Sequence, residues 1–331
     1  MTVKNKFYKG KSWMLPFSLI LLLLAIVIIE QIFTSPDAAA SKQAAGSVSY
    51  SPPPHMAEIE KEVKELNDLI YHDSDNSVLD IYYPEKANEP LPVIVWIHGG
   101  GYIGGSKDSR RDYGMTLAHS GYVVANIDYS LAPAQKYPGP ILQANAALEY
   151  LQLHAAKFGG DMSRIFIGGD SAGAQIASQV SAVISNKELA GAMGIEPVVQ
   201  ADQLRGAILF CGLFNMETVR ATEFPNIELF LNAYTGVEPF ESFKNIGELS
   251  TVDHITADYP AVFITVGDGD PFSTQSQELV NTLQSNNISV SSVFFEGTQK
   301  NLQHEYQYAL DTIDAQETLE KTVDFLYLNS Q

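Results

Sequence analysis

One serine of the sequence has the neighbours that a nucleophile needs. Ser171 lies in the run GGDSAG at 168–173, between a predicted strand at 165–168 and a predicted helix at 174–184. A sharp turn from strand to helix exposes the serine oxygen and brings the flanking backbone so close that glycine is required on both sides. The helix then points its amino end at the serine, and the N–H of Ala172 can receive an oxyanion. The run therefore predicts nucleophilic catalysis by Ser171.

A second run of residues is suited to stabilising negative charge. The run HGGG at 98–101 follows a predicted strand at 93–97. Three successive glycines are poor for any regular element, so we expect them to turn backbone N–H groups toward the oxyanion of a tetrahedral intermediate. Loss of one such donor typically costs about 3 kcal/mol of transition-state stabilisation. His98 precedes the turn, and we interpret it as a support of this loop; an ordinary glycine-rich loop is the alternative.

A serine hydroxyl needs a base, and the base needs an acid to orient it. Of the seven histidines, His304 follows the last predicted strand on a polar loop, where the chain order serine, acid, histidine places the base. The alternative is an exposed loop histidine. Two aspartates, Asp268 and Asp270, follow the predicted strand at 261–266. We favour Asp270 as the acid because Pro271 fixes the turn after it, and we expect Asp268 to form the turn by bonding local amides.

The elements that must position these residues alternate between short β-rich segments and longer helical ones. Strands are predicted at 79–83, 93–97, 122–128, 165–168, 207–211, 261–266 and 290–295. Helices are predicted at 141–158 and 174–184, and a short entry helix at 56–68. Several strands are almost continuous apolar runs, which indicates that both faces of the sheet are covered. The pattern predicts an α/β protein with a mostly parallel, doubly wound central sheet and helices on both faces.

Two segments, 186–204 and 215–249, do not fit this alternation. The second is the longer one. It carries large apolar side chains, namely Phe224, Phe230, Leu231, Tyr234, Phe240 and Phe243. An aromatic insertion beside a catalytic face can form a small helical cap over the pocket. The alternative is a helical excursion that only shields the edge of the sheet.

The amino-terminal part differs in composition from the rest. A short basic segment at 1–12 precedes an apolar run at 13–33, and a segment rich in alanine and proline follows at 34–55. We expect a cytoplasmic start, a transmembrane signal-anchor helix and a flexible linker, with the catalytic domain at 56–331 outside the cell membrane. The alternative is a cleaved signal peptide, with the alanines at 38–40 as its cleavage site, and a secreted enzyme.

Composition excludes several classes of protein. The 331 residues include 20 basic and 39 acidic side chains, and a surface this acidic repels phosphate backbones, so nucleic-acid binding is not expected. The hydrophobic fraction of 45% is sufficient for a core, which excludes global disorder. The single cysteine, Cys211, excludes an intrachain disulfide and a cysteine-rich metal site.

Taken together, the motifs resemble those of a known family. The runs HGGG at 98–101, YSLAP at 129–133 and GDSAG at 169–173, followed by Asp270 and His304, resemble the hormone-sensitive-lipase-like carboxylesterases of the α/β-hydrolase superfamily. The resemblance implies an α/β-hydrolase fold with an eight-stranded sheet and a cap, and a serine hydrolase without metal or cofactor. It also implies an oxyanion hole formed by Gly100, Gly101 and Ala172. The catalytic triad that it implies consists of Ser171, Asp270 and His304.

We therefore expect a serine carboxylic-ester hydrolase that acts through an acyl-enzyme on small-molecule esters of short to medium acyl length, with the lipid bilayer as a partner through 13–33. The same apparatus can expel an amine, so an amidase or formamidase is one alternative. The other alternative is a catalytically idle pseudo-hydrolase that serves in binding.

Overall fold

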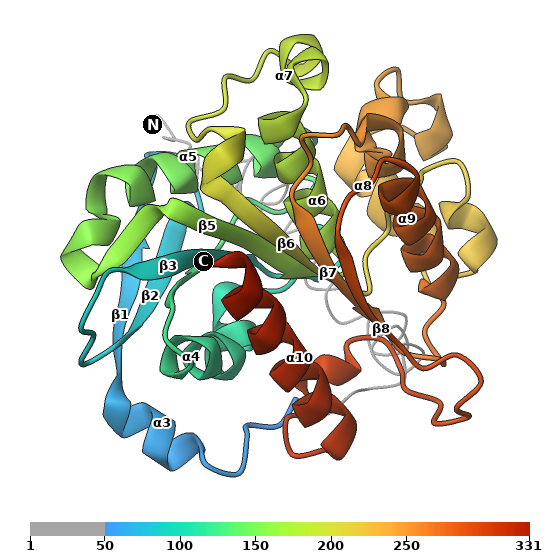
Figure 1. Ribbon diagram of the computed structural model, residues 1–331. Helices are drawn as coiled ribbons and strands as arrows, with labels where there is room; N and C mark the ends of the chain where they lie inside the picture. Colours follow the sequence, from blue (N-terminus) through green and yellow to red (C-terminus); the bar gives the residue numbers. More distant parts are fainter. Residues whose placement is uncertain (1–49) are drawn as a thin grey trace, which may run out of the picture. The chain divides into compact units, whose positions relative to one another are not determined.

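The computed structural model describes residues 50–331, which are built around one eight-stranded sheet (Figure 1). The strands occur in the order β1-β2-β4-β3-β5-β6-β7-β8. Pairs β1/β2 and β2/β4 are antiparallel, and all pairs from β4/β3 to β7/β8 are parallel. Their bounds are β1 Val63–Ile70, β2 Val78–Pro84, β3 Leu91–Ile97, β4 Val123–Ile127, β5 Gly160–Asp170, β6 Leu204–Phe210, β7 Ala261–Val266 and β8 Val290–Phe294.

The central strands are buried on both faces, as their continuous apolar sequences predict. In β3, Val93, Val95 and Ile97 pack into one hydrophobic cluster, whereas Ile94 and Trp96 pack into a second cluster across the sheet. The alternation follows from the two-residue period of a strand. This sheet therefore separates two cores, each of which must be covered by helices.

Different helices cover the two faces of the sheet (Figure 1). One core is completed by α5 (Gly139–His154), α6 (Ala172–Ser185), α7 (Lys187–Met193), α8 (Ile227–Thr235) and α9 (Ser273–Ser285). The other core is completed by α3 (Met56–Glu62), α4 (Arg111–His119) and α10 (Ile313–Asn329). The prediction of an α/β protein with a mostly parallel sheet and helices on both faces is confirmed.

Short 3-10 helices connect many of these elements. The predicted helix at 141–158 is divided into α5 and the 3-10 helix η2, which ends where Gly159 adopts a φ of 78°. The insertion 215–249 contains α8 and several 3-10 turns. The 3-10 helices are η1 Lys107–Arg110, η2 Ala155–Phe158, η3 Ala201–Gln203, η4 Val219–Thr222, η5 Phe240–Ser242, η6 Ile246–Leu249, η7 Thr251–His254 and η8 Tyr306–Tyr308.

The predicted entry helix at 56–68 is wrong in its second half. The helix α3 ends at Glu62, and Val63 already has the extended φ and ψ of −107° and 131°. From Val63 the chain forms β1, which pairs antiparallel with β2 at the edge of the sheet. The helical spacing of apolar residues was a local signal, and the hydrogen bonds offered by the edge of β2 override it. The sequence pattern predicts no strand at this position.

Residues 50–331 contain no helix that is both long and apolar enough to cross a bilayer. A span needs about 20 apolar residues, whereas α10 has 17 residues and includes charged ones. The predicted anchor at 13–33, the segment 1–12 and most of the linker at 34–55 lie outside the described residues. The expectation of a single-pass membrane protein with an extracytoplasmic catalytic domain is therefore corrected, and the bilayer is not retained as a partner.

Candidate active site

Ser171 occupies a strained turn between β5 and α6. Its φ and ψ are 52° and −120°, a region that side chains other than glycine rarely adopt, and only 7% of the residue is exposed. A Cβ on Gly169 would lie 2.5 Å from the Gly173 carbonyl oxygen, and one on Gly173 would lie 2.1 Å from the Ile97 oxygen. The glycines on both sides of the serine are therefore required by close backbone approach, as the run GGDSAG predicts.

The structure brings Asp270 and His304 together. The His304 Nδ1 and an Asp270 carboxylate oxygen are 2.8 Å apart, although the residues are 34 positions apart in the sequence. Burial lowers the pKa of His304, but the carboxylate of Asp270 outweighs this effect and holds the pKa well above its usual value. The other oxygen of Asp270 accepts the Phe272 N–H at 2.9 Å, which fixes the orientation of the carboxylate.

The nucleophile and the acid–base pair lie at adjoining strand ends. The Ser171 N–H donates to the carbonyl of Phe210 at the end of β6. Cys211, which follows Phe210, donates its N–H to the carbonyl of Thr265 in β7. Cys211 in turn lies against His304. No hydrogen bond joins the Ser171 hydroxyl to His304 in the described part of the chain. Such catalytic hydrogen bonds often form only when the substrate is bound.

Asp268 has a different role from the one expected. Its carboxylate accepts the N–H of Leu302 at 2.7 Å and the hydroxyl of Thr298 at 3.3 Å. Both partners lie in the loop that leads to His304, and not in the local turn. Asp268 therefore ties the end of β7 to the histidine loop, whereas Asp270 contacts the histidine itself.

The HGGG loop has the backbone geometry that only glycine tolerates. Gly100 and Gly101 have φ values of 118° and 61°. A Cβ on Gly100 would lie 2.2 Å from the Gly104 oxygen, and one on Gly101 would lie 2.8 Å from the ring of Phe230. Ala172 is the first residue of α6, so its N–H has no partner within the helix. These three N–H groups remain our candidates for the oxyanion hole.

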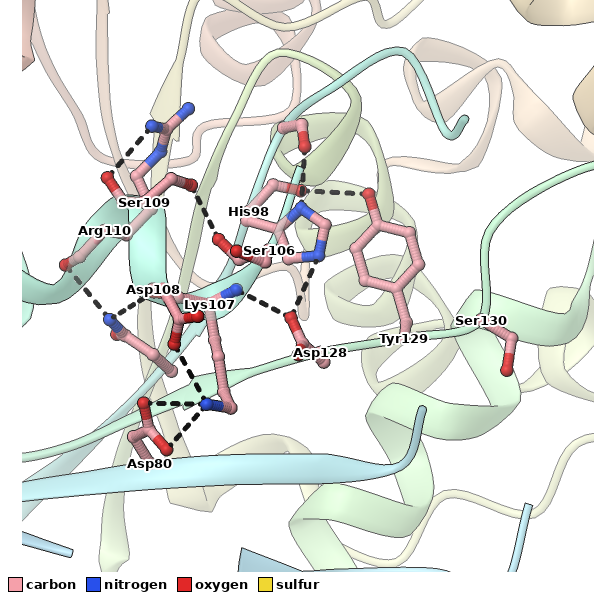
Figure 2. Close-up of polar contacts among 12 residues, drawn as sticks. Asp80, His98, Ser106, Lys107, Asp108, Ser109, Arg110, Asp128, Tyr129 and Ser130 are labelled. Atoms are coloured by element: carbon pink, nitrogen blue, oxygen red, sulfur yellow. Dashed lines mark hydrogen bonds and ion pairs between the residues drawn. The ribbon is translucent and has the colours of Figure 1, made fainter. Parts of the chain in front are cut away.

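The side chain of His98 supports the HGGG loop through its contacts with Gly99 and Tyr129. The imidazole is buried, its Nδ1 lies 2.7 Å from the Gly99 oxygen, and its ring stacks on Tyr129 with the centroids 4.4 Å apart. Burial lowers the pKa of His98 to about 4, so the ring is neutral near pH 7. Its Nε2 faces Asp128 at 3.5 Å (Figure 2). These contacts fit the interpretation of His98 as a support and not as the base.

Asp128 holds a proton more tightly than an ordinary aspartate. Burial raises its pKa from 3.8 to about 6, although the backbone N–H of Lys107 donates to it at 2.6 Å (Figure 2). Between about pH 4 and pH 6 the folded protein therefore keeps a proton that the unfolded chain has released. The contribution of Asp128 to stability is fully present below its unfolded pKa and is lost as the pH rises through 6.

We expect Asp128→Asn to flatten the pH dependence of stability. The amide can accept the Lys107 N–H but does not ionise, so the unfolding free energy should fall less between pH 4 and pH 6 than in the wild type. Urea denaturation at several pH values in this range measures the difference. Asp258→Asn, at an exposed position, is the matched control. Parallel curves for the wild type and Asp128→Asn would contradict the assignment.

A buried charge cluster joins the three loops of the site. The guanidinium of Arg110 donates to both oxygens of Asp170, at 2.9 and 2.6 Å, and lies 3.2 Å from Glu305. Asp170 also accepts the N–H of Gly99 at 3.0 Å and the hydroxyl of Tyr308 at 2.7 Å. Sequence analysis missed this cluster. Asp170 directly precedes Ser171, and Glu305 directly follows His304. Two acids at these positions could have indicated that a buried cation pairs with them, but not that this cation is Arg110.

The pKa values of the two carboxyl groups in this cluster are shifted in opposite directions. Burial alone would raise the pKa of Asp170, but the bidentate Arg110 lowers it well below its usual range. Burial raises the pKa of Glu305, and the negative charge of Asp170 adds to this effect although Arg110 opposes it. Arg110 therefore holds an ionised Asp170 directly before Ser171 and draws the histidine loop toward it.

Two rings of the insertion 215–249 reach the site. Phe224 stacks on Phe272 with the centroids 4.2 Å apart and meets the ring of His304 edge-on at 4.9 Å. Phe230, in α8, lies against Gly101 of the HGGG loop. These contacts favour the cap interpretation over that of a shield for the sheet edge, and they identify which aromatic residues of the insertion face the chemistry.

Comparisons with known proteins bear on the family and the fold of the chain. Residues 79–283 match the model of the BD-FAE family. The chain is 39% identical over 120 residues to carboxylesterase NlhH of Mycobacterium tuberculosis, a match that spans only 36% of either protein. It is 25% identical over 232 residues to the acetyl esterase of Salmonella choleraesuis, covering 66% of this chain and 67% of the relative. Esterase B of Lactobacillus rhamnosis, a solved structure, has a TM-score of 0.75 at 22% identity, covering 95% of this chain and 97% of the other.

Proposed function

The chain belongs to the BD-FAE family and has the α/β-hydrolase fold, and from this premise we propose that it is a serine hydrolase of carboxylic esters. The observation that carries the proposal is the placement of Ser171 on its strained turn beside the hydrogen-bonded pair of Asp270 and His304. The names of its relatives, carboxylesterase and acetyl esterase, support the same chemistry. The catalytic domain comprises residues 56–331, with 215–249 as its cap.

The proposed reaction passes through an acyl-enzyme. The oxygen of Ser171 attacks the acyl carbon while His304 takes its proton, and the charge of Asp270 stabilises the imidazolium that forms. The backbone N–H groups of Gly100, Gly101 and Ala172 donate to the oxyanion. His304 then returns the proton to the leaving alcohol. In the second half, His304 activates water, which releases the carboxylic acid and regenerates the serine.

Covalent labelling tests this function directly. A fluorophosphonate probe should form one adduct per chain, and peptide mass spectrometry should place it on Ser171. Matched ester and amide substrates should then give a higher kcat/KM for the ester. Absence of labelling in a folded protein would contradict the serine mechanism, and a preference for the amide would contradict the assignment to esters.

The cap aromatics suggest short acyl chains. The ring of Phe230 lies against Gly101, one of the proposed oxyanion donors, and would therefore border the bound acyl group. We expect Phe230→Ala to raise the ratio of kcat/KM for octanoate over acetate esters by at least about tenfold, because removing a ring creates space for several methylene groups. The ratio is measured with a p-nitrophenyl ester series. Leu229→Ala, exposed on the same helix, is the control and should leave the ratio unchanged.

A further inference from the structure

Cys211 adds a third donor to the acid–base pair. It is the first residue after β6, with a φ of 41° in the left-handed region, and its side chain is fully buried. One donor atom of each side chain, the Cys211 sulfur, a carboxylate oxygen of Asp270 and a ring nitrogen of His304, lies within 4.8 Å of the other two. The proposed hydrolysis uses the carboxylate and the imidazole but has no role for the thiol.

These three donors are of the kinds that Zn²⁺ prefers. Thiolate, imidazole and carboxylate all occur as zinc ligands, and three protein ligands with one open position is a common arrangement. The carboxylate oxygen and Nδ1 are now 2.8 Å apart, and a tetrahedral zinc ion would hold them about 3.3 Å apart. The carboxylate oxygen and Nδ1 would therefore have to separate by about half an ångström to bind the same ion.

We propose that Cys211, Asp270 and His304 bind Zn²⁺ and that the ion inhibits the enzyme. On binding, the thiol releases its proton to solvent. As Nδ1 of His304 coordinates the ion, the single ring proton of the neutral imidazole passes from Nδ1 through solvent to Nε2. Because Nε2 then carries this proton, it cannot accept a proton from Ser171. The inhibitory effect rests on the proposed function, whereas the metal site itself does not.

Direct binding tests the site without any catalysis. Full-length Ser171→Ala retains all three ligands, so titration calorimetry with zinc chloride should give one ion per chain. Co²⁺ in place of zinc should give a thiolate-to-cobalt charge-transfer band and the visible bands of a tetrahedral site. Adding Cys211→Ser should weaken zinc binding by at least about tenfold and abolish the charge-transfer band. Cys211→Ala is the second variant should the serine impair folding.

The control for binding is His72→Ala, which removes an exposed histidine and should leave the affinity unchanged. Equal affinity in Ser171→Ala with and without Cys211→Ser, or no cobalt–thiolate band, would overturn the proposed site.

Inhibition is measured separately: zinc should inhibit ester hydrolysis by the wild type, and the half-inhibitory concentration should rise at least about tenfold in Cys211→Ser. Equal inhibition of both would overturn the inhibitory role. Cysteine-dependent zinc binding to a chain that hydrolyses no ester would overturn the proposed function while leaving the site intact.

Discussion

Ser171→Ala is expected to lower kcat for ester hydrolysis by at least about 10⁴-fold, because loss of the nucleophile of a triad removes nearly all of the covalent route. Residual hydrolysis would come from the N–H groups of the oxyanion hole acting on bound substrate and water. A p-nitrophenyl acetate assay at substrate concentrations above and below KM measures kcat and kcat/KM. Activity within tenfold of the wild type, in a folded variant, would contradict the assignment.

Two further substitutions separate catalysis from folding. Ser163→Ala makes the same chemical change at an exposed position of the same strand, β5, and should leave kcat unchanged. Ser171→Gly should be as inactive as the alanine variant but about 1 kcal/mol more stable than the wild type, since glycine adopts the positive φ of 52° without strain. A more stable, inactive glycine variant would indicate that the positive φ of Ser171 lowers the unfolding free energy while it holds the serine oxygen in its catalytic position.

Arg110→Met is expected to cost about 3 to 5 kcal/mol of unfolding free energy, because it leaves the buried carboxylate of Asp170 without its cation. The guanidinium is 4% exposed and makes a bidentate contact. Methionine has a similar length but no charge, so packing is largely kept. Urea denaturation near pH 7 gives the unfolding free energy. Arg110 also joins the nucleophile turn to the histidine loop through Glu305, so kcat should fall as well.

The adjacent residue provides the matched control for this substitution. Arg111 pairs with Glu60 and Glu65 at the surface and is 34% exposed. Exposed ion pairs contribute little, so Arg111→Met should cost less than about 1 kcal/mol. The lowered pKa of Asp170 adds a pH signature: its contribution to stability is present above its unfolded pKa and is lost as the pH falls, and Arg110→Met should remove that contribution. Equal losses for the two arginine variants would contradict the importance of the buried cluster.

Local signals determined the parts of the fold and site that could be predicted. The turn at Ser171 is recognisable within six residues, because Gly169 avoids a clash with Gly173 in the turn itself, whereas Gly173 also makes room for Ile97 of β3. The apolar strands and intervening helices likewise follow from patterns of a few residues each. The preference for Asp270 over Asp268 came from turn chemistry, and the distance of 2.8 Å to His304 agrees with it. Where a local pattern met a competing neighbour, as at β1, the prediction failed.

Only the tertiary structure decided which distant side chains meet at the site. Arg110 lies 60 positions from Asp170, and its place in the cluster depends on how η1, the segment before α4, packs against the turn at Ser171. Cys211 reaches His304 because β6 lies between β5 and β7 in the sheet. Phe224 reaches the same histidine because the insertion folds back onto β7 and its following turn. The sequence specifies backbone conformation through contacts between near neighbours, whereas these partnerships depend on strand order and packing, which no pattern of a few residues encodes.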